Sequence, residues 1–240
     1  MSKISLIFYW VFFAVLNLKA SEYEITVLAT NTANFGGIGE WSFSALLESD
    51  DEKILFDTGF NENTVLHNAN LLGKDLSQVE KVILSHFHGD HTGGLIKLRK
   101  TFKEINSKAF STVYVAEGFF EQRYDENGEL RGFIGGFNDV DNFLKETDDL
   151  GIRFVILKEP IEISKNLYLS GPVERIHEKV VVSPGFYLKK DGLLLDDLVL
   201  DDQSLGILTE QGWYMMSGCG HAGMINTCLL YTSDAADDWS

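Results

Sequence analysis

Three of the six histidines of this 240-residue chain fall within one stretch, Ser85-His86-Phe87-His88-Gly89-Asp90-His91. His86 and His88 are two residues apart, so on an extended segment their imidazoles point to the same side. Neutral imidazole nitrogens are preferred ligands of Zn²⁺, at distances of about 2.0–2.1 Å. The spacing therefore predicts that His86 and His88 bind one metal ion together.

Asp90 and His91 follow at once and face a neighbouring position. A carboxylate and an imidazole suit a second divalent ion. Two such ions can share and deprotonate a water molecule and can polarise the bond that it attacks. The alternative is a set of surface histidines on a loop. It is disfavoured because four ligand-type side chains crowd a loop directly after the apolar run 81–84.

His221 is the candidate ligand from a distant part of the chain. It lies in the loop GCGHAG, residues 218–223, whose glycines permit the close backbone approach that a metal pocket needs. We predict that it joins His86 and His88. Cys219 could be a soft ligand, but we expect it to pack inward. His67 and His177 are expected at the surface or in packing, unless the segment around His177 folds over the cleft.

Asp57 ends the apolar run in ILFDTG, residues 54–59. It has two interpretations. The first is an aspartate that forms a turn or a cap. The second is an acceptor that orients the histidine loop, as carboxylates commonly do around metal ligands. The residues alone leave both open, and the family resemblance given below favours the second.

The elements that must position these residues alternate between strand-like and helix-like patterns. Strands are expected at 24–30, 43–48, 53–56, 81–84 and 112–116, helices at 63–72 and 93–102, and a hairpin at 204–216. The candidate residues therefore follow the ends of strands. Residues 117–200 are less regular, with strands expected at 153–157 and 167–170, and are interpreted as an insertion. Its aromatic side chains are expected to line the substrate side of the cleft: Phe119, Phe120, Tyr124, Phe133 and Phe137.

Both ends of the chain are predicted to lie outside the folded domain. Residues 1–20 read as a signal peptide, with Lys3, an apolar run at 4–16 and Ala20 before the cut. That run is shorter than the roughly 20 residues of a membrane-spanning helix. We expect an exported, periplasmic or secreted protein with no stable membrane anchor after cleavage. The alternatives are a buried N-terminal helix or an uncleaved anchor. Residues 228–240, CLLYTSDAADDWS, resemble the translation of a sequencing adapter and are expected to be non-native.

Composition limits the class of partner. With 36 acidic against 20 basic residues, the net charge of −16 argues against a nonspecific nucleic-acid binder, which needs Lys and Arg on one face. Two cysteines exclude a disulfide scaffold. The length suits one domain, here 21–227. A small-molecule substrate is expected, and the sequence leaves the oligomeric state open.

The three motifs resemble those of the metallo-β-lactamase superfamily of metal-dependent hydrolases: ILFDTG, SHFHGDHTGG at 85–94 and SGCGHAG at 217–223. Residues 65–95 and 201–227 are similar to a branch related to dihydropterin ribofuranosyl-aminobenzene-phosphate synthase. The resemblance implies an α/β fold, a four-layer αββα sandwich with the metals at the edge between the sheets. It implies that His86, His88 and His221 hold one zinc. It also implies that Asp90 and His91 hold part of a second.

The resemblance also implies where this chain departs from the family. Members usually supply further ligands of the second site, including a late histidine, after the GCGHAG-type loop. That segment is missing here, so we expect a C-terminally truncated domain that is inactive if those ligands are essential.

The expected activity is that of a zinc-dependent hydrolase with one or two Zn²⁺, or another divalent metal. A metal-bound hydroxide would attack a small-molecule ester, lactone, thioester or phosphoester. Asp90 is the expected catalytic residue, which holds the nucleophile and passes a proton to the leaving group. The alternatives are a non-catalytic member that binds a metal or ligand, and a nuclease-like member, which the acidic charge disfavours. His88 disfavours an iron redox member, because those normally carry an acidic residue at that position.

Overall fold

The computed structural model describes residues 23–178 and 184–232. The predicted signal peptide and residues 233–240 lie outside the described residues. The elements in chain order are β1 (Glu24–Ala29), β2 (Ser44–Glu48), β3 (Lys53–Phe56), α1 (Thr64–Leu71), β4 (Val79–Ile83), α2 (Gly89–Thr92), α3 (Leu95–Phe102), β5 (Thr112–Ala116), β6 (Arg123–Tyr124), α4 (Val140–Asp149), β7 (Arg153–Leu157), β8 (Ile161–Ser164), β9 (Leu167–Leu169), β10 (Tyr187–Lys190), β11 (Leu193–Asp196), β12 (Ser204–Thr209), β13 (Gly212–Ser217) and α5 (Met224–Thr232).

Two sheets form the centre of the domain. The first has six strands in the order β1-β2-β3-β4-β5-β7. Its first three strands pair antiparallel, and β3, β4, β5 and β7 run parallel. The second sheet has the order β13-β12-β9-β8 with antiparallel pairing. Parallel strands direct their carboxyl ends to one edge, which places the loops after β3 and β4 side by side.

Alternation along the strands divides the apolar side chains between two cores. In β3, Ile54 and Phe56 belong to the core between the sheets, whereas Leu55 packs with the core under the helices. In β4, Val82 and Ile83 divide in the same way. Side chains of a strand point alternately to its two faces, so strands buried on both faces read as continuous apolar runs. This explains why ILF and VIL occur in the sequence without polar alternation.

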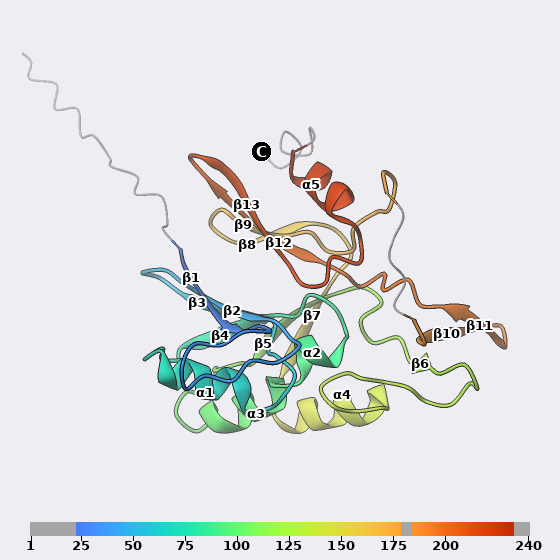
Figure 1. Cartoon of the computed structure of the whole chain (residues 1–240), viewed down its shortest axis with the longest axis horizontal. Coiled ribbons are helices and arrows are strands. Elements are labelled where there is room, and N and C mark those ends of the chain that lie inside the picture. The colour runs from blue at the N-terminus through green and yellow to red at the C-terminus, as the bar shows by residue number, and fades with distance from the viewer. Residues whose placement is uncertain (1–22, 179–183, 233–240) are drawn as a thin grey trace, which may run out of the picture.

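The layers follow from these two cores. Helices α1, α3 and α4 cover the outer face of the six-stranded sheet, and α5 lies on the far side of the four-stranded sheet (Figure 1). The order helix–sheet–sheet–helix is the four-layer αββα sandwich expected from the sequence. Helix α5 spans residue 228, where the adapter-like string begins.

The region interpreted as an insertion, 117–200, contains parts of both central sheets. Strand β7 pairs with β5 in the six-stranded sheet, and β8 and β9 belong to the other sheet. Among the described residues, the parts outside the two central sheets and their helices are therefore limited to about 118–139, 171–178 and 184–200. They include a small third sheet with the order β11-β10-β6. The strand predicted at 153–157 is confirmed as β7, but its place in the central sheet is not predictable from its pattern, because it lies at the sheet edge and four of its five residues are half-buried or exposed.

Within the described residues, every helix is too short or too polar to cross a bilayer.

Candidate metal centre

The histidine loop begins where β4 ends and leads into the short helix α2 (Gly89–Thr92). His86 is fully buried, and His88 is almost so. Nε2 of His86 lies 2.8 Å from Nδ1 of His88, and Nδ1 of His86 lies 2.9 Å from the Ser85 hydroxyl. The two imidazoles thus share one buried position at the edge of the six-stranded sheet.

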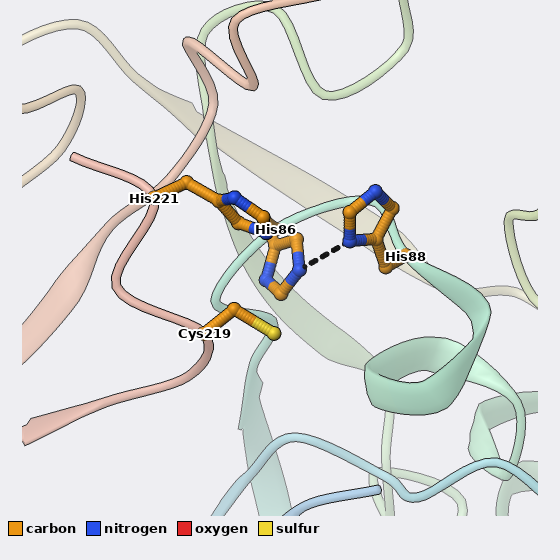
Figure 2. Close-up of side chains that lie close together, drawn as sticks. All are labelled: His86, His88, Cys219 and His221. Carbon is orange, nitrogen blue, oxygen red and sulfur yellow. Dashed lines mark hydrogen bonds between the residues drawn. The ribbon is translucent and has the colours of Figure 1, made fainter. Parts of the chain in front are cut away.

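The loop after β13 brings His221 to the same position. The ring centroid of His221 lies 4.9 Å from that of His86 and 5.1 Å from that of His88. Figure 2 shows these three rings gathered with the Cys219 side chain directed toward them. One ligand atom from each of His86, His88, Cys219 and His221 lies within 4.8 Å of the others. The loops after β4 and β13 therefore meet, as the sequence predicts.

The first group of ligand atoms fits a divalent cation. Nε2 of His88 is buried and has no hydrogen-bond partner among the described residues, a costly state for a polar atom without a ligand. Burial, followed by repulsion from the neighbouring histidines, holds the pKa of His86 well below its usual value. The same causes lower the pKa of His88 to about 3. Both rings are therefore neutral at pH 7, the form that binds metal.

A second group of ligand atoms lies beside the first. Atoms of Asp90, His91 and Cys219 also lie within 4.8 Å of one another. Nε2 of His91 is 3.6 Å from Oδ2 of Asp90 and 3.3 Å from Sγ of Cys219. The expectation that Cys219 packs inward was wrong: its side chain is exposed and belongs to both groups. The sequence could not show this, because it depends on where the β13 loop crosses α2.

Asp57 is buried beneath His91. Its Oδ2 accepts a hydrogen bond from the Ser85 hydroxyl at 2.8 Å and lies 2.6 Å from Nδ1 of His91. Its Oδ1 accepts from the Ser85 backbone N–H at 2.7 Å. Burial lowers the pKa of His91, but the Asp57 carboxylate outweighs it and raises that pKa well above its usual value. With Nδ1 held by Asp57, Nε2 is directed at Cys219 and Asp90, and this nitrogen would give up its proton on binding a metal.

Close packing at Gly218 lets the second loop approach the first. A Cβ atom at this position would lie 2.2 Å from Oγ of Ser85 and 3.3 Å from Oδ2 of Asp57. Only glycine fits this approach without displacing the residues that orient His91. Steric exclusion of a side chain thus explains the first glycine of the loop 218–223.

The buried segment 201–203 holds the histidine loop from behind. Oδ2 of Asp201 accepts a hydrogen bond from the backbone N–H of Phe87 at 2.8 Å, between the two buried histidines. The backbone N–H of Gln203 donates to the Ser85 carbonyl at 2.9 Å. Both bonds fix the backbone of the loop on either side of His86.

The same segment also holds the loop that carries His221. Oδ2 of Asp202 accepts a hydrogen bond from the backbone N–H of Ala222 at 2.7 Å, directly beside His221. Segment 201–203 therefore fixes both ligand loops, a role that was not predicted from the sequence. An acidic pair directly before an apolar strand is the signal that could have found it.

Arg123 balances the charge of this buried segment. Its Nε and Nη2 atoms lie 2.9 Å and 3.0 Å from carboxylate oxygens of Asp197 and Asp201. Its guanidinium also lies 3.7 Å from the centre of the Phe87 ring. Burial raises the pKa of Asp201, although Arg123 opposes this. Burial raises the pKa of Asp202 to about 7. The network behind the histidines is thus a buried ion-pair cluster.

A cavity of about 670 Å³ opens over both groups of ligand atoms. Asp90 lines it, as a residue that acts on a substrate must. The lining residues are Trp41, Phe60, His88, Asp90, Arg131, Gly132, Phe133, Asn138, Phe186, Cys219 and His221.

Region 117–200 lines the cavity as expected, through residues such as Arg131, Phe133 and Phe186, but most of the five aromatic residues named for this role do not. Of the five, Phe133 lines the cavity. Phe119 is buried in the core under the helices, and Phe120 and Phe137 pack against that core. Apolar side chains in an irregular segment read alike whether they face a cleft or the core.

The other two histidines stand apart from these groups. Nε2 of His67, on α1, lies 2.8 Å from the Gly36 carbonyl. The backbone N–H of His177 donates to the Asn226 side chain at 2.7 Å, and His177 does not line the cavity. The segment around His177 therefore packs on α5 and does not deliver this side chain to the cleft.

Comparison with known proteins identifies the family. The family model of the Metallo-beta-lactamase superfamily matches residues 42–224, which include both ligand loops. The chain belongs to this superfamily.

Relatives within the superfamily show which of its branches the chain is similar to. The chain is 30% identical over 219 residues to 7,8-dihydropterin-6-methyl-4-(beta-D-ribofuranosyl)-aminobenzene-5'-phosphate synthase of Methanocaldococcus jannaschii, covering 87% of this chain and 71% of that protein. It is 32% identical over 128 residues to the anti-Pycsar protein Apyc1 of a Paenibacillus species, covering 52% of this chain and 47% of that protein. The branch expected from the sequence is confirmed.

A solved structure shares the fold. A metal-dependent hydrolase of the beta-lactamase superfamily matches with a TM-score of 0.66 and 29% identity, covering 90% of this chain and 72% of that one. The superfamily fold therefore accounts for the two sheets, their covering helices and the meeting of the ligand loops at the sheet edge.

Proposed function

We propose that this protein is a zinc-dependent hydrolase of a small-molecule ester, lactone, thioester or phosphoester. The observation that carries the proposal is the pair of ligand groups that share Cys219 at the floor of one cavity. His86, His88, Cys219 and His221 would hold one cation, and Asp90, His91 and Cys219 part of a second site. A divalent cation there supplies a Lewis acid and lowers the pKa of a water molecule.

The residues of this chain have distinct tasks in that reaction. Asp57 orients His91 through the contact with Nδ1. Segment 201–203 holds the two loops at a fixed separation. Asp90 lines the cavity with its carboxylate close to His91, and would hold the attacking water and pass its proton to the leaving group. The cavity walls exclude bulk water from one side of the substrate.

The test begins with metal content. Zinc-loaded protein should contain one or two Zn²⁺ per chain, and Co²⁺-loaded protein should show a thiolate charge-transfer band in the near ultraviolet that C219S lacks. Hydrolysis is then measured on 4-nitrophenyl acetate, a thioester, a lactone and bis(4-nitrophenyl) phosphate. H88A should lose both metal and hydrolysis, whereas H67A, which changes a histidine outside the groups, should keep both.

The outcomes separate the rival functions. Metal binding without hydrolysis of any of these substrates would favour a non-catalytic binding member. The Methanocaldococcus relative is named a synthase, so similarity to it does not by itself predict hydrolysis. Absence of bound metal in the wild-type protein would refute the proposal.

Export of the protein and its restriction to small molecules belong to the same proposal. The acidic net charge supports the second point. Cell fractionation of the full chain tests the first. RNA binding at low salt would contradict the second.

A further inference from the structure

The wall of the cavity above the ligand groups contains aromatic side chains and one arginine that have no role in the proposed reaction. One part of its wall is aromatic: Trp41, Phe60, Phe133 and Phe186. Trp41 is 78% exposed, Phe60 49% and Phe133 38%. Clustered aromatic side chains that remain in water at the rim of a cavity mark a surface that a ligand covers.

These aromatic side chains are arranged for a flat ligand. The rings of Phe60 and Phe133 lie 5.6 Å apart and are tilted by 30°. They come from distant parts of the chain, the loop after β3 and the segment 118–139. Rings in this arrangement present π-faces and edges on which another flat group can pack.

Arg131 supplies a cation to the same cavity. Among the described residues that line it, Arg131 is the one arginine, and none is a lysine. Its Nη1 donates to the Gly185 carbonyl at 2.8 Å, and its guanidinium lies 4.8 Å from the centre of the Phe186 ring. These two contacts hold the guanidinium in place and leave Nε and Nη2 without a hydrogen bond to the described residues. A guanidinium placed in this way suits a carboxylate or a phosphate.

An unused cation is notable in this chain because acidic residues outnumber basic ones by 36 to 20. Arg131 contributes little to the charge balance of Asp125, whose pKa is lowered first by a hydrogen bond from the backbone of Glu129 and only last by Arg131. Among the described residues, Arg131 therefore has no ion-pair partner, in contrast to the buried Arg123.

We infer that the substrate is an aromatic anion: a flat apolar body that packs on Trp41, Phe60 and Phe133, with a carboxylate or phosphate held by Arg131. The inference rests on the proposed function, because it takes the cavity to be the substrate site. The bond to be cleaved then lies toward His88, Asp90 and Cys219, which line the same cavity. Neutral aliphatic esters are predicted to be poor substrates.

The experiment measures binding without any reaction. The probes are 8-anilinonaphthalene-1-sulfonate and N-phenyl-1-naphthylamine, which share an aromatic body and differ by one anionic group. Fluorescence titrations use the full chain, both zinc-loaded and chelator-treated. R131Q should weaken binding of the sulfonate about tenfold and that of the neutral amine less than about twofold. W41A should weaken both.

The controls keep the inference falsifiable. R153Q changes an exposed arginine on β7 and should alter neither titration. R131K keeps the charge but loses the forked geometry, so it should weaken sulfonate binding less than R131Q does. Equal loss of both probes in R131Q, or no loss of either, would overturn the inference. The inference would also be overturned if benzyl alcohol displaced the sulfonate as effectively as benzoate or phenyl phosphate does. Of the last two, the stronger competitor identifies the anion.

Failure of this inference and failure of the proposed function are distinguishable. If H88A binds zinc and the wild-type protein hydrolyses nothing, the proposed function fails, while the titrations of chelator-treated protein keep their meaning. If hydrolysis is found but R131Q binds both probes normally, only the inference fails.

Discussion

Asp57 and His91, 34 positions apart in the chain, are joined by a contact of 2.6 Å between Oδ2 and Nδ1. Asp57 adopts a left-handed backbone conformation with a φ of 56°, which non-glycine residues seldom take up without compensating contacts. Its two contacts with Ser85 and the one with His91 provide that compensation. The carboxylate is thus held in a strained position where it directs one nitrogen of His91 toward the second group of ligand atoms.

Substitution D57N should weaken metal binding more than it weakens folding. Asparagine keeps the size of the side chain and tolerates the left-handed conformation, but it loses the charge that holds the proton on Nδ1 of His91. Zinc affinity should fall about 10- to 100-fold, as for other lost partners of metal-binding histidines. Competition with a chromophoric chelator measures this. D75N, outside the site, should bind zinc as the wild type does.

Zinc should stabilise the wild-type protein against heat through His88. A ligand present at 100 times its Kd stabilises the folded state by about 2.7 kcal/mol. For a domain of this size that corresponds to a rise in Tm of roughly 5–10 °C. Differential scanning calorimetry with and without EDTA should show the rise for the wild type and for H67A. H88A should show little or none. A full zinc-dependent rise in H88A would mean that this imidazole is not a ligand.

Replacing Arg123 should destabilise the fold. R123M leaves Asp197 and Asp201 buried without their counter-charge, and the loss of one partner of a buried ion pair costs about 3–5 kcal/mol. Urea unfolding of the metal-free protein measures the change. The double variant R123M/D197N should recover part of it, and R153Q should stay within about 0.5 kcal/mol of the wild type. An unchanged unfolding midpoint in R123M would contradict this account of the network.

Gly93 is predicted to be intolerant of any side chain. A Cβ atom there would lie 1.9 Å from the Phe60 carbonyl oxygen, which is backbone and cannot rotate away. G93A should therefore exceed the usual cost of overpacking, about 1–3 kcal/mol. G73A is the matched control: its φ is +68° and no atom lies within 4 Å, so only the conformational cost of about 1–2 kcal/mol applies. Urea unfolding of both variants gives the comparison, and equal costs would refute the steric explanation.

The elements that build the centre are predictable from the sequence because their patterns are local. Apolar runs such as ILF and VIL predict strands buried on both faces. The histidine spacing predicts a metal site at the ends of these strands. Strand β7 is recognisable as a strand but reads as part of an insertion, since four of its five residues are exposed or half-buried. Its pairing with β5 is a long-range contact that no local pattern contains.

The unpredicted parts of the site depend on packing between distant segments. Cys219 belongs to both groups of ligand atoms because of the path of its loop, and its residue type alone favoured burial. Arg131 and Trp41 reach the cavity from loops that are far apart in the sequence, a proximity that no local pattern contains. Segment 201–203 carries two aspartates whose position before an apolar strand is a local signal, but their contacts with both ligand loops depend on the tertiary structure.

The bond between Asp201 and the Phe87 backbone spans 114 positions of the chain, and that from the Gln203 side chain to the Leu84 carbonyl spans 119. Contacts of such long range form late and slow folding. A polypeptide emerging from the ribosome exposes His86, His88 and His91 long before residues 201–221 exist to order them. We therefore expect high-affinity zinc capture to accompany the final folding step rather than precede it, which stopped-flow refolding in the presence of a zinc-responsive dye would show as a single shared rate.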